Sequence, residues 1–82
     1  MVTIAYDDHF KKLITKIKDT SLQKKIKKQI EKIINNPEIG KPMRFSRKGT
    51  REVYIPPFRL SYLYLNREDK IIFLDLYHKN HQ

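Results

Sequence analysis

The stretch that decides the expected fold is Gly40–Tyr62, with the sequence GKPMRFSRKGTREVYIPPFRLSY. It combines aromatic and β-branched residues, which favour strands, with six Lys or Arg residues. We expect strands over about Arg51–Ile55 and Phe58–Leu65, joined at Pro56-Pro57. Because two prolines cannot supply the positive φ of a tight primed hairpin turn, we expect a wider loop there. The stretch predicts a basic sheet that can hold a polyanion in a fixed geometry.

Two amphipathic helices are expected before this stretch. Their apolar residues recur at helical spacing; they are Phe10, Leu13, Ile14 and Ile17 in the first helix, and Leu22, Ile26, Ile30, Ile33 and Ile34 in the second. Asp7 or Asp8 is suited to cap the first helix, and Ser21 the second. Since only a short break at residues 19–21 separates them, an antiparallel helix hairpin is expected.

The remaining segments complete an α+β arrangement. Val2–Tyr6 suits a strand, and Lys70–Tyr77 is expected to pair after a turn at Asn66–Asp69. Residues 40–48 are expected to be irregular, with room for a short strand near Met43–Phe45. The order predicts one domain over residues 1–82: an N-terminal strand, a helix hairpin, then an antiparallel sheet of three to four strands. The helices should cover one sheet face and leave the other open.

Strand alternation assigns side chains to these two faces once a register is chosen, with Tyr54 opposite Arg59 and Leu65 opposite Ile71. The expected core face carries Val53, Ile55, Phe58, Leu60, Tyr62, Tyr64, Ile72, Leu74 and Leu76. The expected open face carries Glu52, Tyr54, Arg59, Ser61, Leu63, Phe73, Asp75 and Tyr77. Two rows cross the open face, one of Tyr54, Arg59 and Tyr77, the other of Glu52, Ser61 and Asp75.

The charge balance points to a polyanionic partner. Lys and Arg number 18 against 9 Asp and Glu, a net charge of +9. Long-range attraction and counterion release then favour nucleic acid as the ligand. The same surplus also fits an acidic protein partner, or a surface that merely aids solubility.

Several classes of protein are disfavoured by the composition. The chain has no Cys, so disulfides and Cys-based metal sites are excluded. No stretch approaches the roughly 18 apolar residues of a membrane span, so no membrane partner is expected. The N-terminal residues lack the basic and apolar regions of a signal peptide, which makes the cytoplasm the expected location.

The open face carries groups suited to RNA cleavage, in which the ribose 2′-OH attacks its own 3′ phosphate. Arg59 would neutralise the charge of the phosphorane, usually the largest catalytic contribution. Tyr, His or a Lys of lowered pKa would exchange the protons, and aromatic rings would stack on bases. His78 and His81 are too small a set to bind a metal, so no metal or other cofactor is expected.

Structural roles remain open for several of these residues. Tyr54 fits a surface aromatic of a strand, and Glu52 fits an ion-pair partner of Arg51, Arg59 or a helix lysine. Asp75 could simply hold Arg59 in place. His78 falls on the core face by alternation unless the strand ends or twists at Tyr77.

Four motifs carry a family resemblance: Asn36-Pro37-Glu38-x-Gly40-Lys41-Pro42, Lys48-Gly49-x-Arg51-Glu52-Val53, Phe58-Arg59-Leu60-Ser61-Tyr62 and Leu76-Tyr77-His78-Lys79. With these spacings after a two-helix hairpin, the chain resembles the RelE/ParE superfamily of toxins from type II toxin–antitoxin modules. Within it, the chain is most similar to the RelE, YoeB and YafQ branch. The resemblance implies a RelE-like fold and a metal-independent endoribonuclease that cuts mRNA in the ribosomal A site.

The resemblance also implies roles for particular residues. Arg59 matches the catalytic arginine that binds phosphate, Tyr54 takes the place of a catalytic lysine or histidine, and His78 and Lys79 match the closing basic group. RNA contacts, including those to ribosomal RNA, are expected from Arg44, Arg47, Lys48, Arg51, Tyr77 and His81. An acidic antitoxin protein is the implied partner, with helices or an extended tail that cover the basic surface.

Two departures keep other functions open. Met43 stands where some members have a carboxylate, and the chain ends without the aromatic residue that closes several members. The ParE branch shares the fold but poisons gyrase without RNase residues, so a non-catalytic toxin that acts on gyrase or RNA is the alternative. A small ribosome- or RNA-binding protein outside toxin modules is the third hypothesis.

Overall fold

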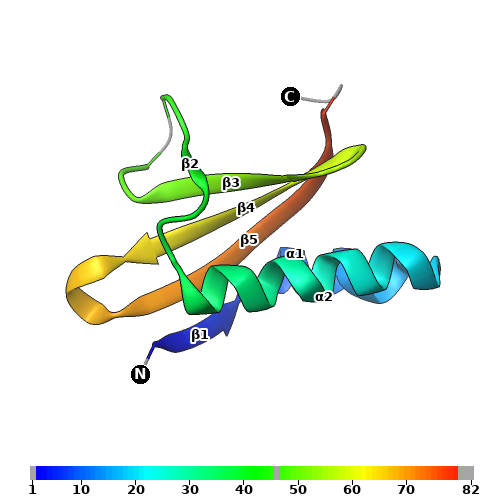
Figure 1. Ribbon diagram of the computed structural model, residues 1–82, viewed down its shortest axis with the longest axis horizontal. Helices are drawn as coiled ribbons and strands as arrows, with labels where there is room; N and C mark the ends of the chain where they lie inside the picture. Colours follow the sequence, from blue (N-terminus) through cyan, green and yellow to red (C-terminus); the bar gives the residue numbers. More distant parts are fainter. Residues whose placement is uncertain (1, 46, 80–82) are drawn as a thin grey trace.

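Five strands form one mixed sheet, in the order β1-β5-β4-β3-β2, in the computed structural model, which describes residues 2–45 and 47–79 (Figure 1). The strands are β1 (Thr3–Tyr6), β2 (Lys41–Pro42), β3 (Thr50–Ile55), β4 (Phe58–Leu65) and β5 (Lys70–His78). The helices are α1 (Asp8–Lys16) and α2 (Thr20–Asn35). This order confirms the expected α+β fold, with β1 added in parallel to β5 at one edge of the sheet. In the described part of the chain, neither helix is long and apolar enough to cross a membrane.

Each helix is capped at its N-terminus by an aspartate. The side chain of Asp7 accepts a hydrogen bond from the backbone N–H of His9, as expected for a cap of α1. In α2 the expectation of Ser21 as the cap is wrong. The carboxylate of Asp19 accepts from the N–H groups of Ser21 and Leu22, so the helix begins at Thr20, one residue before the expected cap. Asp19 also places a negative charge at the positive end of the helix.

Both helices pack on the same face of the sheet. Phe10 of α1 and Ile26 and Ile33 of α2 are buried in one cluster with strand residues. The strand residues of this cluster are Ile55, Leu60, Tyr62, Ile71, Phe73 and Leu76. The face away from the helices is therefore left to the alternate residues of β3, β4 and β5.

A bulge in β5 corrects the expected division between the two faces. Ser61 pairs with Asp75 whereas Tyr62 pairs with Phe73, which leaves Leu74 as an extra residue in β5. Before the bulge, Leu65 pairs with Lys70 rather than with Ile71. Phe73 is therefore a core residue and not an open-face one, and Ile72 and Leu74 do not belong to the core cluster. After the bulge, Asp75 and Tyr77 face away from the helices, as expected.

Two connections also differ from the expectations. The loop at Pro56-Pro57 is tight, because Ile55 pairs directly with Phe58. The peptide bond between the prolines is cis, and neither proline has a positive φ. The short strand expected near Met43–Phe45 is displaced, since β2 ends at Pro42 and Phe45 adopts a φ of 59°.

The connection from α2 to β2 is fastened by the phenol of Tyr62. The hydroxyl donates to the carbonyl of Pro37 and accepts from the N–H of Gly40, both at 2.8 Å. A side chain at residue 40 would collide, because a Cβ there would lie 2.5 Å from this hydroxyl. Arg51 adds hydrogen bonds from Nη1 to the carbonyls of Glu38 and Gly40. These contacts explain why the segment after α2 contains a glycine at this position.

Replacing Tyr62 by Phe tests this fastening. Tyr62→Phe leaves a buried N–H and a carbonyl without partners, so we expect the free energy of unfolding to fall by about 1–3 kcal/mol. Tyr64→Phe is the matched control, because that hydroxyl contacts only the exposed side chain of Asn66 at 3.3 Å. Urea denaturation of both variants measures the difference. Equal losses of stability would contradict the structural role of the Tyr62 hydroxyl.

Candidate functional site

Tyr54, Arg59 and Tyr77 form one row across the three central strands, on the face away from the helices. Tyr54 pairs with Arg59 between β3 and β4, and Arg59 pairs with Tyr77 between β4 and β5. Both expected rows are therefore confirmed as neighbours in the sheet, since Ser61 also pairs with Glu52 and Asp75. The strands hold these side chains in fixed positions along one surface.

Glu52 joins two members of the first row. One carboxylate oxygen accepts from Arg59 Nη1 at 2.6 Å, and the other accepts from the Tyr77 hydroxyl at 2.6 Å. The Glu52 side chain is only 16% exposed, against 34% for Arg59. Of the structural roles considered for Glu52, an ion pair with Arg59 is the one observed. Asp75, by contrast, makes its contacts elsewhere and does not hold Arg59.

Arg59 keeps a donor that has no acceptor. Its Nε atom is buried and has no hydrogen-bond partner among the described residues. An unpaired buried donor is costly, particularly in a charged group, unless a ligand or water satisfies it. The guanidinium is anchored by Glu52 through Nη1, and the exposed 34% of the side chain is open to a further oxygen.

The phenol of Tyr77 stays protonated far above neutral pH. Burial, followed by the hydrogen bond and negative charge of Glu52, raises the pKa of Tyr77 to about 12 from its ordinary value of 10.0. Arg59 acts in the opposite direction and Asp75 adds a smaller increase. Tyr77 is thus a hydrogen-bond donor at this site rather than a base.

The ring of Tyr54 lies between two cations. Arg59 Cζ is 5.9 Å from the ring centroid, and Lys79 Nζ is 5.7 Å from it. Both distances are within the range of cation–π attraction. Tyr54 is 49% exposed, so the ring also remains accessible from solvent. Lys79 and Tyr54 are consequently gathered with Arg59, as the sequence predicted.

His78 lies away from this group. It pairs with Phe58 on the side of the core, where the two rings meet edge to face at 5.7 Å. The alternation that placed it on the core face is confirmed, and the structure does not bring it together with Arg59. His81 lies outside the described residues.

Four of the expected RNA-binding residues separate into two groups. Arg44 is exposed and lines a groove beside Glu52. Arg47 and Lys48 are exposed in the loop between β2 and β3, next to a different hollow. Arg51 lines that second hollow as well, and its guanidinium donates to the carbonyls of Glu38 and Gly40. Only Arg44 of these four therefore borders the surface that Arg59 occupies.

The groove beside Glu52 has a volume of about 650 Å³. Its lining includes Lys41, Met43, Arg44, Ser61 and Asp75, together with Glu52 and Tyr77. Lys41 was not predicted as a site residue, although its motif was noted and it pairs with Glu52 at the end of the second row. The groove thus extends the site from Arg59 along the second row.

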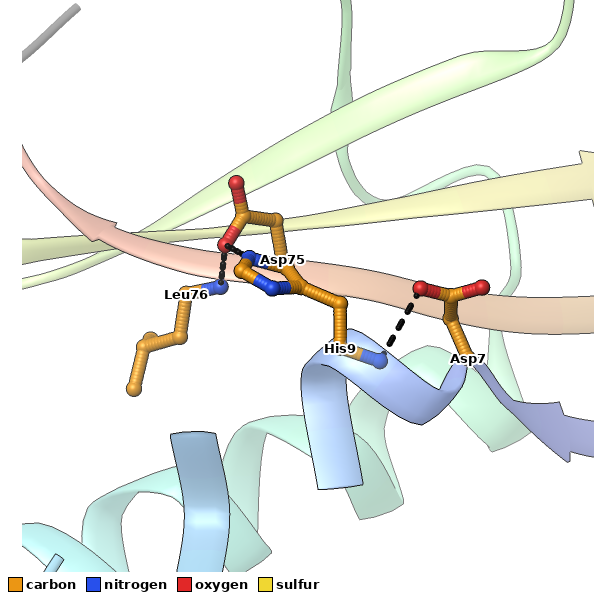
Figure 2. A network of polar contacts seen from close by, with 4 residues as sticks. All are labelled: Asp7, His9, Asp75 and Leu76. Carbon is orange, nitrogen blue, oxygen red and sulfur yellow. Dashed lines mark hydrogen bonds and ion pairs between the residues drawn. The ribbon is translucent and has the colours of Figure 1, made fainter. Parts of the chain in front are cut away.

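His9 was also missed, since its partner is 66 residues away. Its Nε2 lies 3.1 Å from Oδ1 of Asp75, and the N–H of Leu76 donates to the same oxygen at 2.8 Å (Figure 2). These two contacts fix the orientation of the Asp75 carboxylate at the border of the groove. In residues 2–45 and 47–79, no group of three or more His, Asp and Glu side chains is placed to hold a metal ion.

Comparison with known proteins identifies related chains. The family model described as ParE toxin of type II toxin–antitoxin system, parDE, matches residues 4–82. No curated protein sequence matches significantly.

Solved structures show the same fold at low sequence identity. A chain of the intact E. coli RelBE toxin–antitoxin complex has a TM-score of 0.81 at 15% identity, covering 95% of this chain and 96% of that one. A chain of the E. coli DinJ–YafQ complex has a TM-score of 0.77 at 22% identity, with coverage of 99% and 97%. A chain of the Mycobacterium tuberculosis RelBE2 complex has a TM-score of 0.75 at 20% identity, with coverage of 95% and 98%.

The pKa of Tyr77 reports on the contact with Glu52. Since the folded pKa lies above 10.0, the phenol contributes its stability fully below about pH 10, and that contribution is lost as the pH rises toward about 12. Glu52→Gln removes the charge and should shift the pKa of Tyr77 down toward 10.0. Ultraviolet titration of the phenolate measures this, with Tyr77→Phe identifying the signal. Glu38→Gln is the charge-matched control and should leave the pKa of Tyr77 unchanged. If Glu52→Gln also leaves the pKa of Tyr77 unchanged, the contact between Glu52 and Tyr77 is refuted.

Proposed function

We propose that this chain, which belongs to the ParE toxin family of type II toxin–antitoxin systems, is a toxin that acts as a ribosome-dependent endoribonuclease. Its substrate is mRNA in the ribosomal A site, with ribosomal RNA bound by the basic surface. It acts in the cytoplasm, where ribosomes translate.

The position and contacts of Arg59 are the observation that supports this proposal. Arg59 lies on the sheet face away from the helices, keeps a buried Nε donor without a partner, and has aromatic rings on both sides of it in the row. The Arg59 side chain is 34% exposed, and a phosphate oxygen would bind the accessible part of its guanidinium in a charge-assisted hydrogen bond. Tyr54, with 49% of its surface exposed, offers a ring for base stacking next to the phosphate.

The proposed reaction is a transesterification within the RNA, to which this chain contributes side chains of the open sheet face. The ribose 2′ oxygen attacks phosphorus while the bond from phosphorus to the 5′ oxygen breaks, which leaves a 2′,3′-cyclic phosphate and a 5′ hydroxyl. Arg59 binds the oxygens on which negative charge develops. Tyr54 and Lys79, which lie close to each other beside Arg59, take the 2′ proton and give a proton to the leaving 5′ oxygen.

An antitoxin is the protein partner that we propose. Tyr6, Phe10, Ile14, Ile17, Ile26 and Ile30 line an apolar groove between the two helices and β1. Lys11 and Lys27 border the groove, and the outer side of α2 carries further exposed lysines. An amphipathic helix with acidic residues along the edges of its apolar face complements both the apolar lining and the bordering lysines.

A gyrase-directed toxin is the second candidate, since the family model that matches is that of ParE toxins. In that case the basic face would bind protein or DNA without cutting RNA. Supercoiling assays with purified gyrase separate the two functions. Inhibition of supercoiling, without cuts in mRNA, would favour this candidate over the ribonuclease.

Arg59→Ala tests the ribonuclease. Loss of a donor that stabilises a transition-state charge typically costs about 10²–10³-fold in rate, so induced Arg59→Ala should no longer stop growth. Primer extension on ribosome-bound transcripts should show cuts with the wild type and almost none with the variant. Arg67→Ala is the matched control, because it removes one exposed positive charge in the turn before β5. Wild-type toxicity of a folded Arg59→Ala protein would reject the assigned role.

Coexpression tests the antitoxin. A short acidic protein encoded beside this chain should restore growth and purify with the chain as a complex. Hydrogen exchange of the complex should then show added protection at the facing sides of α1 and α2. Protection restricted to β2 and the loop after it would place the partner elsewhere.

A further inference from the structure

We propose that the groove beside Glu52 is a nucleobase subsite that selects guanine, and that Asp75 makes the selection. The inference rests on the proposed function, which supplies RNA as the ligand. It adds a specificity-determining residue that neither the family match nor the fold comparison assigns.

The position of the groove relative to Arg59 is the first argument. Glu52 and Tyr77, which form the anchor of the guanidinium, also line the groove. Ser61 follows Arg59 by two residues in β4, a distance of about 7 Å along a strand. A base whose phosphate is bound at Arg59 can therefore reach the groove. With a volume of about 650 Å³, the groove has room for a purine.

The orientation of Asp75 is the second argument. Its Oδ1 is occupied by Leu76 N–H and His9 Nε2, whereas Figure 2 shows Oδ2 pointing away from His9. No hydrogen bond to Oδ2 is found among the described residues, and the side chain is 38% exposed. The carboxylate is thus held by one oxygen and presents the other as a fixed acceptor.

Ser61 supplies the third argument. Its residue is only 5% exposed and lines the groove, yet within residues 2–45 and 47–79 its hydroxyl makes no hydrogen bond. Among the described residues Arg59 Nε is the one enclosed side-chain polar atom without a partner, so the Ser61 hydroxyl is open to the groove and available for a hydrogen bond with a ligand there. The groove therefore contains a polar group that lacks the partner a base edge would bring.

Guanine fits this set of groups better than the other bases. Its Watson–Crick edge presents two adjacent donors, N1–H and the N2 amino group, to the acceptor Oδ2. Its O6 and N7 atoms are the usual acceptors for Lys and Arg, here Lys41 and Arg44 at the border of the groove. Adenine, cytosine and uracil each present an acceptor next to their donor, which a carboxylate repels.

The binding of mononucleotides tests the subsite without ribosomes or cleavage. The intact 82-residue chain is titrated with the 3′-monophosphates of guanosine, adenosine, cytidine and uridine, and amide signals are followed by NMR. We expect guanosine 3′-monophosphate to bind about tenfold more tightly than the others, as one well-formed base contact provides. The largest shifts should occur at Ser61 and Asp75.

Three variants make the test specific. In Asp75→Asn the amide oxygen is held by Leu76 N–H, so the amino group faces the base and the guanine preference should disappear. Glu31→Gln removes the same charge from an exposed position on α2 and should keep the preference. His9→Ala removes one of the two contacts that orient the Asp75 carboxylate and should weaken the guanine preference without abolishing it, because the bond to Leu76 N–H remains.

Two results would overturn the inference. They are equal affinity for the four nucleotides, and an unchanged guanine preference in a folded Asp75→Asn protein. Failure of the proposed function would give a different result. If the chain prefers guanosine 3′-monophosphate in this titration but cuts no mRNA, the subsite stands and the ribonuclease proposal is rejected.

Discussion

One extra residue in β5, Leu74, decides what each face of the sheet carries. Without the bulge, Phe73 and Asp75 would lie on the same face, and either an aromatic ring or a carboxylate would be misplaced. With it, Phe73 stacks on Phe10 and Tyr6 at 5.8 and 5.5 Å between centroids, while Asp75 joins the polar row. The bulge at Leu74 thus places Phe73 in the core and Asp75 in the site.

The site combines a strong positive field with one buried anion. The chain has a net charge of +9. Arg59, at the centre of the sheet, is nevertheless paired with the carboxylate of Glu52 at 2.6 Å. Removing a guanidinium from water is costly, and a close carboxylate with a second hydrogen bond to Tyr77 offsets that cost. An incoming phosphate therefore meets a preorganised cation, and it has to share that cation with Glu52.

Local pattern was sufficient for most of the fold and for the centre of the site. The hairpin of β3 and β4 aligns Tyr54 with Arg59, and helical spacing identified Phe10, Ile26 and Ile33. The rule that successive strand residues face opposite sides gave the wrong face for Phe73. A bulge reverses which residues face the core, and the apolar pattern of the strand gives no sign of it. The contact of His9 with Asp75 could not be predicted either, since it depends on how α1 meets the end of β1 and the neighbouring β5.

The brevity of β2 has a consequence for how copies of this chain behave in a crowded cell. An outermost strand with free backbone groups invites other chains to add to the sheet, and such growth ends in aggregates. Here the outer strand has two residues, both exposed, of which one is a lysine and the other a proline that lacks an N–H. This border of the sheet is therefore protected against self-templated growth, a safeguard of value to a protein that carries so many strand-forming residues in its central segment.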